Sequence, residues 1–303
     1  MKIGIVSAEP SGDLLGSKLL SVLEQKFDDI SLVGVGSGPL SNYGLSGDRA
    51  LLEIMGLVDP ILNYKKITNF RKKLIKDFIK EEIDVFIGID APDFNFEIHK
   101  QMQKEGIKTI HVVCPSVWAW RPGRIKHFKH VDYMLCLFPF ELEYCANVRK
   151  QAFCIGHPLI DEKEAYVNEF KENIICIMPG SRKSEIKNNL GVMIDGFNQF
   201  NIEENFKAVI PVYKKEDKYL IQHKIQDHEF ITCEHVKSAE VLKKSKAAVV
   251  CSGTATLETL LAGIPTTVVY KTNWFNHFIL KRLMLSEFAS IPNIIADEEI
   301  FLE

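Results

Sequence analysis

Short apolar runs, several of them unbroken stretches of valine and isoleucine, occur throughout the chain and alternate with helix-like segments. A continuous apolar run of strand length is typical of a strand that is covered on both faces, as in a parallel sheet. Strands of this kind that alternate with amphipathic helices predict an α/β protein with doubly wound parallel sheets.

The expected strands form two series. The first series comprises 2–7, 31–35, 85–89, 109–114, 133–137 and 152–155, and the second comprises 174–178, 208–211, 230–233, 247–251 and 266–270. The clearest helical patterns between them cover 14–26, 70–82 and 256–262.

The two series are separated by residues 156–171, which begin Gly-His-Pro-Leu and continue into a charged run. We interpret this stretch as an interdomain connector, and we give His157 a hinge role. The 303 residues are about twice the length of a usual single domain. We therefore expect two Rossmann-like domains, 1–160 and 161–303, that face each other across a cleft, with ligands at the carboxyl ends of both sheets.

Composition excludes several classes of protein. Hydrophobic residues make up 46% and charged residues 25% of the chain, which excludes a disordered chain. The formal net charge of −3 gives no basic excess, so we expect no nucleic-acid partner. No apolar run reaches the roughly 18 residues of a membrane span. The seven cysteines include no C-x-x-C pair, so we interpret them as free thiols in a reducing cytoplasm.

The turn after the first strand, residues 7–18, matches neither a Walker A motif nor G-x-G-x-x-G. Two interpretations are open. Ser11 or Asp13 caps the following helix, or Glu9, Ser11 and Asp13 form a polar rim on the floor of the cleft. The glycine-rich stretch 34–39 likewise fits either a ligand close to the backbone or a simple loop.

The segment 84–95 reads D-V-F-I-G-I-D-A-P-D-F-N, in which a buried strand ends at Asp90 and Pro92 stops its continuation. A carboxylate at the carboxyl end of such a strand lies where ligands bind in open α/β sheets. We therefore expect Asp90 to act as a general base, and Asp93 to serve mainly a structural purpose.

Two tryptophans, Trp118 and Trp120, lie one residue apart after the next strand, and Arg121 follows them. Their indoles are suited to stack on a sugar or to line an acyl groove. The alternative is that both are core aromatics at a domain edge.

In the second half, one strand ends in a Gly-Ser turn with Ser181 and Arg182, and another ends in Ser252, Gly253 and Thr254. Backbone N–H groups at a helix N-terminus together with a guanidinium predict a diphosphate site. Glu258, one turn into the helix, is placed to accept two ribose hydroxyls. We find no D-x-D motif and no metal-ligand spacing, so we expect no metal and no cofactor.

The segment 61–76 contains six basic residues and no acid, with an interleaved apolar set. Two interpretations are open: a solvated helix face, or a basic amphipathic patch on an anionic membrane.

These motifs, in this order, resemble those of the lipid-A-disaccharide synthase family, bacterial inverting glycosyltransferases of the GT-B fold. The matching stretches, which extend over nearly the whole chain, are 11–13, 55–58, 88–95 (G-I-D-A-P-D-F-N), 115–120 (P-S-V-W-A-W), 139–141, 156–159, 178–182, 252–258 and 292–293. Val112, Cys114, Ser37 and Pro60 depart from the usual pattern, which bears on acceptor-side details.

The resemblance implies a metal-independent reaction that joins UDP-2,3-diacylglucosamine to 2,3-diacylglucosamine 1-phosphate, forming the β(1→6) disaccharide 1-phosphate and UDP. It implies that Asp90 is the base, that Arg182 holds the diphosphate, that Glu258 binds the ribose and that Asn293 lies near the nucleotide. Two alternatives are a UDP-sugar epimerase on the same fold and a non-catalytic UDP-sugar binder.

The expected partners are the UDP-linked donor, the sugar-phosphate acceptor and an anionic inner-membrane surface, and the expected location is the cytoplasm, peripheral to the inner face of that membrane. A second candidate for lipid contact is 274–282, which is apolar with a basic end. Family members usually continue for several dozen residues past the Pro-Asn motif, so we expect the second domain to lack this closing tail. Acyl-chain length and oligomeric state stay open.

Overall fold

The computed structural model describes residues 1–303 apart from 9, 46–63, 168–171, 202–204, 213–214 and 272–283. The chain divides into two compact units, Met1–His157 and Pro158–Glu303. The expected boundary after residue 160 lies inside η4 (Pro158–Tyr166), a 3₁₀ segment of the second unit. Tyr166 is buried in the core of that unit, so the predicted connector is partly a packed element.

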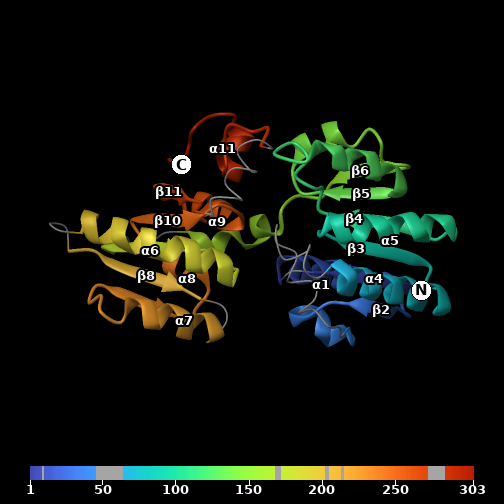
Figure 1. Ribbon diagram of the computed structural model, residues 1–303, viewed down its shortest axis with the longest axis horizontal. Coiled ribbons are helices and arrows are strands. Elements are labelled where there is room, and N and C mark those ends of the chain that lie inside the picture. The colour runs from blue at the N-terminus through green and yellow to red at the C-terminus, as the bar shows by residue number, and fades with distance from the viewer. Residues whose placement is uncertain (9, 46–63, 168–171, 202–204, 213–214, 272–283) are drawn as a thin grey trace. The chain divides into compact units, whose positions relative to one another are not determined.

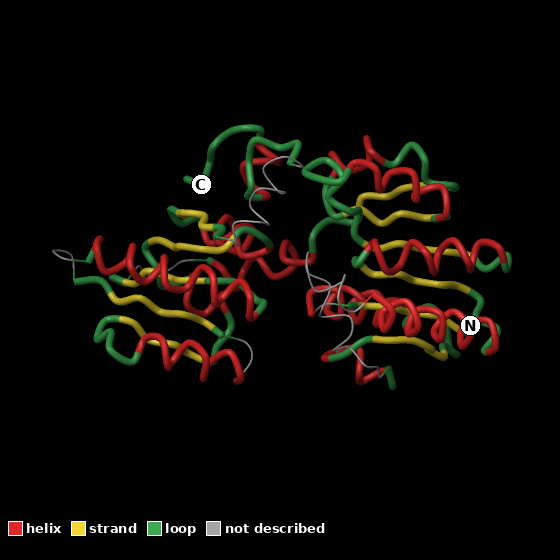
Figure 2. The backbone as a smooth tube through the Cα atoms, in the orientation of Figure 1, coloured by secondary structure: helices red, strands yellow, loops and turns green. Residues whose placement is uncertain are grey.

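Unit 1 is built on a six-stranded parallel sheet with the order β2-β1-β3-β4-β5-β6 (Figures 1 and 2). Its strands are β1 (Lys2–Ser7), β2 (Ser31–Val35), β3 (Val85–Ile89), β4 (Lys108–Val112), β5 (Tyr133–Cys136) and β6 (Gln151–Cys154). Its helical elements are α1 (Pro10–Glu24), η1 (Gly38–Tyr43), α4 (Tyr64–Lys80), α5 (Pro92–Lys104), η2 (Pro122–His130) and η3 (Pro139–Tyr144).

Alternating side chains of the central strands of unit 1 supply two separate cores. Ile3 and Ile5 of β1 pack with the α1 side of the sheet, whereas Val6 packs with the side that α4 and α5 cover. Both faces are therefore apolar, which explains why these strands read as continuous hydrophobic runs.

Helix α1 approaches the sheet closely because Gly12 and Gly16 lie one turn apart on its inner face. A Cβ atom on Gly12 would lie 2.7 Å from the Ser7 hydroxyl oxygen, and one on Gly16 would lie 2.8 Å from a methyl of Ile89. This contact brings the first turn of α1 against the ends of β1 and β3.

Residues 64–76 of the basic segment lie in α4, and most apolar side chains of this helix face the core of unit 1. Ile67, Leu74 and Phe78 are buried, and Phe70 and Ile75 pack against the same cluster. These buried apolar side chains are therefore not available for contact with a membrane. Exposed lysines cover the outer side of the helix: Lys65, Lys66, Lys72, Lys73, Lys76 and Lys80.

Unit 2 is built on a five-stranded parallel sheet with the order β11-β10-β7-β8-β9. Its strands are β7 (Ile174–Met178), β8 (Lys207–Pro211), β9 (Ile231–Glu234), β10 (Ala247–Cys251) and β11 (Thr266–Val269). Its helices are α6 (Lys183–Phe200), α7 (Lys215–Ile225), α8 (Ser238–Leu242), α9 (Thr254–Ala262) and α11 (Ile291–Ala296). Helices α6 and α7 cover one core, and α8, α9 and η4 cover the other.

All eleven expected strands are present, with ends within two residues of those expected, so the doubly wound α/β class is confirmed. Helices α1 and α4 begin earlier than expected, at Pro10 and Tyr64, because the apolar periodicity does not mark their polar first turns. No described helix has both the length and the apolar character to cross a membrane. The motif 55–58 and the segment 274–282 lie outside the described residues.

A pair of buried histidines lies in unit 1 between β4 and α5. The Nε2 of His99 is 3.0 Å from the Nδ1 of His111, and both side chains are fully buried. Burial lowers the pKa of His111 to about 3. Burial, with the nearby His111 and His130, lowers the pKa of His99 well below its usual value.

We predict that unit 1 loses stability as the pH falls from about 6.5, the usual histidine pKa, towards 3. Below 6.5 the unfolded chain binds protons at His99 and His111, whereas the folded chain excludes them, at a cost of about 1.4 kcal/mol per pH unit for each histidine. Urea unfolding at pH 7, 6 and 5 measures this slope.

The variant His99→Phe removes one of the two protons and should flatten the slope by about 1.4 kcal/mol per pH unit. The exposed His223, changed to Gln, serves as the control and should leave the slope unaltered. Equal slopes in the wild type and in His99→Phe would contradict the prediction.

Candidate active site

Each sheet has one place where the direction of winding reverses. In unit 1 this switch point lies between β1 and β3, because β2 flanks β1 on one side and β3 to β6 continue on the other. In unit 2 it lies between β7 and β10. Ligands of open α/β sheets bind outside the carboxyl ends of the strands at such points. Most of the predicted site residues follow β1, β3, β7 and β10, the four strands that flank the switch points, whereas Trp118 and Trp120 follow β4 and Asn293 lies in α11.

Asp90 follows β3 directly and lies at the switch point of unit 1. Its φ is +50° and that of Ala91 is +43°, so two successive residues that are not glycine have left-handed backbone. Its N–H donates to the Val112 carbonyl at 2.9 Å, which extends the ladder with β4 by one bond. Backbone strain of this kind is found at functional sites and persists only where neighbouring contacts enforce it.

Asn95 enforces this turn. Its Nδ2 donates to the carbonyl oxygen of Asp90 at 2.8 Å, with a longer contact of 3.4 Å to that of Ile89. Asn95 is fully buried. Gly88 leaves the room it needs, since a Cβ there would lie 3.0 Å from the Asn95 amide carbon and 2.9 Å from the His99 Nε2. The residues of the motif 88–95 therefore hold the backbone of Asp90 in its left-handed conformation.

Asp93 holds the tryptophan loop to the first turn of α5. Its carboxylate accepts hydrogen bonds from Arg121 at 2.6 Å and from Arg124 at 2.5 Å and 3.2 Å. Burial alone would raise the pKa of Asp93, but Arg124 and Arg121 outweigh it and lower the pKa. This geometry agrees with the structural purpose expected for Asp93.

Trp120 lies beside the same two arginines, whose guanidinium carbons are 5.4 Å (Arg121) and 5.0 Å (Arg124) from its ring centroid. These cation–π contacts orient the indole. Trp118 packs edge-on against Phe140 of η3, with centroids 5.3 Å apart. Both tryptophans are half-buried, and both belong to the loop that Asp93 anchors near Asp90.

Glu141 of η3 is a buried acid that the sequence analysis quoted only as part of a family motif. Its Oε2 accepts hydrogen bonds from the backbone of Leu137 at 2.9 Å and of Phe138 at 3.0 Å. Burial raises its pKa to about 7, although the N–H groups of Phe138 and Leu137 act in the opposite direction. The carboxylate fixes the turn between β5 and η3.

Asp13 lies fully buried in α1, where it accepts hydrogen bonds from the N–H of Ser37 at 3.2 Å and from its hydroxyl at 3.0 Å. It thereby holds the glycine-rich stretch after β2 against α1. Ser11 is exposed in the first turn of the same helix, and Glu9 lies outside the described residues.

In unit 2 a carboxylate occupies the N-terminus of α6. The Oε2 of Glu185 accepts the N–H of Ser181 at 3.0 Å and that of Arg182 at 3.3 Å, and its Oε1 lies 3.7 Å from the Arg182 guanidinium. Gly180 permits this because it has a φ of +125°, and a Cβ there would lie 2.4 Å from that of Glu185. The donors predicted to bind a diphosphate are thus engaged by the chain's own acid.

The second helix N-terminus of this switch point follows β10. Gly253, with a φ of +137°, is the N-cap of α9, and Thr254 is exposed beside it. The Ser252 hydroxyl donates to the Ala289 carbonyl at 2.7 Å, which ties the turn to the segment before α11.

Glu258 lies one turn into α9 and is held by two residues that sequence reasoning missed. The Ser238 hydroxyl donates to its Oε2, and Tyr166 of η4 also hydrogen-bonds to it. Burial raises the pKa of Glu258, and these two hydrogen bonds act in the opposite direction. Both partners are distant in sequence, and neither stands in a recognisable motif.

Asn293 is fully buried, and both atoms of its amide are engaged within the chain. Its Nδ2 donates to the Phe301 carbonyl and to Glu303, each at 2.8 Å, and its Oδ1 accepts from Ile300 at 2.9 Å and from Phe301 at 2.8 Å. The amide therefore organises the segment that follows α11, and a contact with nucleotide stays a prediction.

Asn189 of α6 is a buried amide that joins three strand ends, and sequence reasoning missed it too. Its Nδ2 donates to the Pro179 carbonyl after β7 at 3.2 Å and lies 3.4 Å from the sulfur of Cys251 in β10. Its Oδ1 accepts from the N–H of Lys271 after β11 at 2.7 Å. A polar residue in the apolar stripe of an amphipathic helix was the available signal.

His157 ends unit 1, and its ring stacks on Phe138 with centroids 5.9 Å apart. Burial, and secondarily Lys18, lowers its pKa. A hinge at this residue stays a prediction.

Each unit thus carries one half of a possible transfer chemistry. Unit 1 carries Asp90 on a fixed turn, and the loop that holds Trp118 and Trp120 is anchored three residues further on, at Asp93. Unit 2 presents an arginine, two helix N-termini and a second carboxylate, a combination suited to a nucleoside diphosphate.

Comparison with known proteins decides the family. Residues 3–303 match the sequence profile described as lipid-A-disaccharide synthetase. The chain belongs to the lipid-A-disaccharide synthase family. It is 34% identical over 321 residues to the lipid-A-disaccharide synthase of Idiomarina loihiensis, covering 100% of this chain and 84% of that one. It is 35% identical over 322 residues to that of Francisella tularensis subsp. tularensis, covering 100% and 85%. The predicted resemblance is confirmed.

Two solved structures with similar folds have titles that name UDP or a UDP-sugar. The Staphylococcus aureus MnaA–UDP co-structure has a TM-score of 0.64 at 13% identity, covering 98% of this chain and 86% of that one. The Methanocaldococcus jannaschii UDP-GlcNAc 2-epimerase complex has a TM-score of 0.59 at 14% identity, covering 88% and 83%. At these identities the likeness concerns the fold alone. It confirms the GT-B class expected for a lipid-A-disaccharide synthase.

We predict that Asn189→Ala destabilises unit 2 by about 1–3 kcal/mol, because it leaves the buried N–H of Lys271 and the Pro179 carbonyl without their partner. Urea unfolding measures the loss. The neighbouring Asn188 is exposed on the same helix, and Asn188→Ala should change the stability by less than about 0.5 kcal/mol. Equal effects of the two variants would contradict a bridging role for Asn189.

Proposed function

We propose that this chain transfers a 2,3-diacylglucosamine unit from its UDP donor to 2,3-diacylglucosamine 1-phosphate, releasing UDP and the β(1→6) disaccharide 1-phosphate. The observation that carries the proposal is the strained turn at Asp90, which fixes a carboxylate at the switch point of unit 1 in a chain of the lipid-A-disaccharide synthase family. Unit 1 takes the acceptor, and unit 2 takes the donor.

In the proposed reaction Asp90 removes the proton from the acceptor 6-hydroxyl as that oxygen attacks the anomeric carbon of the donor. The bond from that carbon to the diphosphate breaks on the opposite face, so the configuration inverts and no covalent enzyme intermediate is needed. The half-buried Trp118 and Trp120 border the acceptor side, where aromatic faces suit a sugar or an acyl chain.

On the donor side Arg182, Ser181 and the turn of Ser252, Gly253 and Thr254 bind the diphosphate and stabilise the charge that develops on the leaving group. Glu185 now accepts the N–H groups of Ser181 and Arg182. A bound diphosphate therefore either displaces Glu185 or takes the remaining donors. Glu258, oriented by Ser238 and Tyr166, accepts the ribose hydroxyls.

We predict that Asp90→Asn lowers turnover by on the order of 10²-fold or more, the cost of losing a general base, while UDP affinity stays unchanged. Asparagine also tolerates left-handed backbone, so the turn is retained. The assay follows disaccharide phosphate and UDP with both lipid substrates present.

The control for this variant is Asp28→Asn, the same change at an exposed residue before β2. It should leave turnover at the wild-type level. Wild-type turnover in Asp90→Asn would remove Asp90 from the mechanism.

The same assay separates the two alternative functions. An epimerase would convert its UDP-sugar without the acceptor and release no disaccharide. A non-catalytic binder would bind UDP and give no product with either substrate. Disaccharide that forms only when donor and acceptor are both present supports the transferase.

We further propose that unit 1 adsorbs to an anionic membrane surface, on the cytoplasmic face of the inner membrane, through the exposed lysines of α4. The support is electrostatic: the outer face of α4 carries exposed lysines, whereas Ile67, Leu74 and Phe78 are buried in the core. Adsorption of this kind requires no insertion.

We predict that the double variant Lys72→Glu, Lys73→Glu weakens binding to anionic vesicles by roughly 30-fold or more, since each lysine near the surface contributes about 1 kcal/mol. Sedimentation with vesicles at rising salt measures the affinity, which should fall as salt rises. The control is Lys243→Glu, Lys244→Glu, which makes the same charge change at exposed residues of unit 2. If the two double variants bind equally, α4 is only a solvated face.

A further inference from the structure

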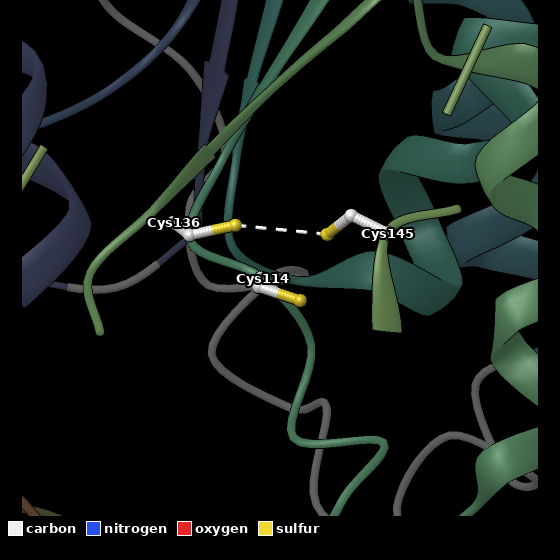
Figure 3. Close-up of side chains that lie close together, drawn as sticks. All are labelled: Cys114, Cys136 and Cys145. Atoms are coloured by element: carbon white, nitrogen blue, oxygen red, sulfur yellow. Dashed lines mark hydrogen bonds between the residues drawn. The ribbon is translucent and has the colours of Figure 1, made fainter. Parts of the chain in front are cut away.

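Three cysteines that are far apart in sequence converge in unit 1. Cys114 follows β4, Cys136 is the last residue of β5 and Cys145 directly follows η3. Their sulfur atoms all lie within 4.8 Å of one another, and all three side chains are buried. Figure 3 shows the side chains meeting from three separate segments, with the sulfurs of Cys136 and Cys145 turned towards each other.

We propose that these three thiols form a structural site for a thiophilic divalent cation of the Zn²⁺ class. Zinc in proteins is tetrahedral with Zn–S distances near 2.3 Å, so two of its sulfur ligands lie roughly 3.8 Å apart. The Cys136 and Cys145 sulfurs are 3.7 Å apart without an ion. The pair is therefore already at ligand spacing.

A disulfide is the competing use of this pair, and the geometry favours the ion. Sulfur atoms in a disulfide are about 2.05 Å apart, so Cys136 and Cys145 would have to move together by more than 1 Å. An ion requires no such approach of this pair, and it also accounts for Cys114, which a disulfide would leave over.

The surroundings of the three sulfurs select a soft ion. The site lies in an apolar cluster that includes Phe96, Val117, Phe128 and Met134. Hard cations such as Mg²⁺ prefer a full shell of oxygen ligands and water, whereas this site offers three sulfurs among apolar side chains. A closed site of this kind is typical of structural zinc, in which no position is kept open for substrate.

Backbone carbonyl oxygens lie beside two of the three sulfurs, and either one could serve as a fourth ligand. The Cys145 sulfur is 3.4 Å from the Glu141 carbonyl, and the Cys114 sulfur is 3.6 Å from the Pro115 carbonyl. Three thiolates with Zn²⁺ carry a net charge of −1, the same as in Cys₃His zinc sites. Binding releases three protons from the three thiols.

The site would join the ends of β4 and β5 to η3. The loop with Trp118 follows β4, and η3 contains Phe140, against which Trp118 packs. The ion would thus stabilise the acceptor side of unit 1 without touching substrate, and it does not enter the transfer reaction.

The test uses the full chain, expressed with added zinc, reduced and freed of loosely bound metal. We expect one Zn²⁺ per chain by mass spectrometry of the metal. We expect each of Cys114→Ser, Cys136→Ser and Cys145→Ser to weaken binding by more than the roughly 10- to 100-fold that loss of an outer-shell partner costs. Competition with a coloured zinc chelator measures the affinity.

The matched control is Cys154→Ser. Cys154 of β6 pairs directly with Cys136 in the sheet, but its side chain is exposed and it does not belong to the cluster. This variant should bind zinc as the wild type does. Zinc bound equally in all four variants would show an adventitious ion only and would overturn the proposal.

Two measurements on the wild type keep the proposal testable even if a cluster variant does not fold. Adding Zn²⁺ to the metal-free chain should release three protons. At a hundredfold excess over the dissociation constant it should raise the melting temperature of unit 1 by roughly 5–10 °C. A reduced, folded wild type that binds no zinc would overturn the proposal. So would a Cys136–Cys145 disulfide that forms to the same extent with and without zinc.

Discussion

The parallel sheet determines where chemistry is located in both units of this chain. Because the strands are parallel, their carboxyl ends all lie at one edge of the sheet. The turns at that edge carry the polar residues of the candidate site. Where the winding reverses, the connections from two adjacent strands leave to opposite faces, and the strand ends between them stay open to a ligand. Asp90 occupies that position in unit 1, and Arg182 and Gly253 occupy it in unit 2.

The turn at Asp90 has a strained backbone that the surrounding residues must hold in place. Two successive residues with positive φ each cost about 1–3 kcal/mol, so nothing in the turn itself favours this conformation. The buried amide of Asn95 and the missing side chain of Gly88 hold it. Asp93, in the first turn of the helix that carries Asn95, pairs with Arg121 and Arg124. Both guanidinium groups lie beside the Trp120 ring and orient it. One short motif therefore sets the backbone of Asp90 and anchors the loop that carries Trp120.

The strands and the turns that follow them were predictable, because local pattern determines both. A continuous apolar run identifies a buried strand, and the residue after it lies at the sheet edge whatever the rest of the chain does. The places of Asp90, Arg182 and Thr254 in the turns after β3, β7 and β10 were predicted in this way. Asn189, Ser238 and Tyr166 were not, because their partners are distant in sequence and only the packed unit brings them together. The cysteine cluster was missed for the same reason, since metal spacing was sought within short motifs.

Glu185 shows why a correct motif is still an incomplete description of a site. The sequence predicts that the N–H groups of Ser181 and Arg182 attract an anion, and in the structure they bind one, supplied by the same helix. The first N–H groups of a helix have no partner within the helix, so an internal carboxylate that accepts from them in the free protein is favourable. A diphosphate that takes these donors must displace Glu185, and the affinity gained is then the difference between two anions at one helix end. On this argument Glu185 weakens the binding of diphosphate, which favours the release of UDP after transfer.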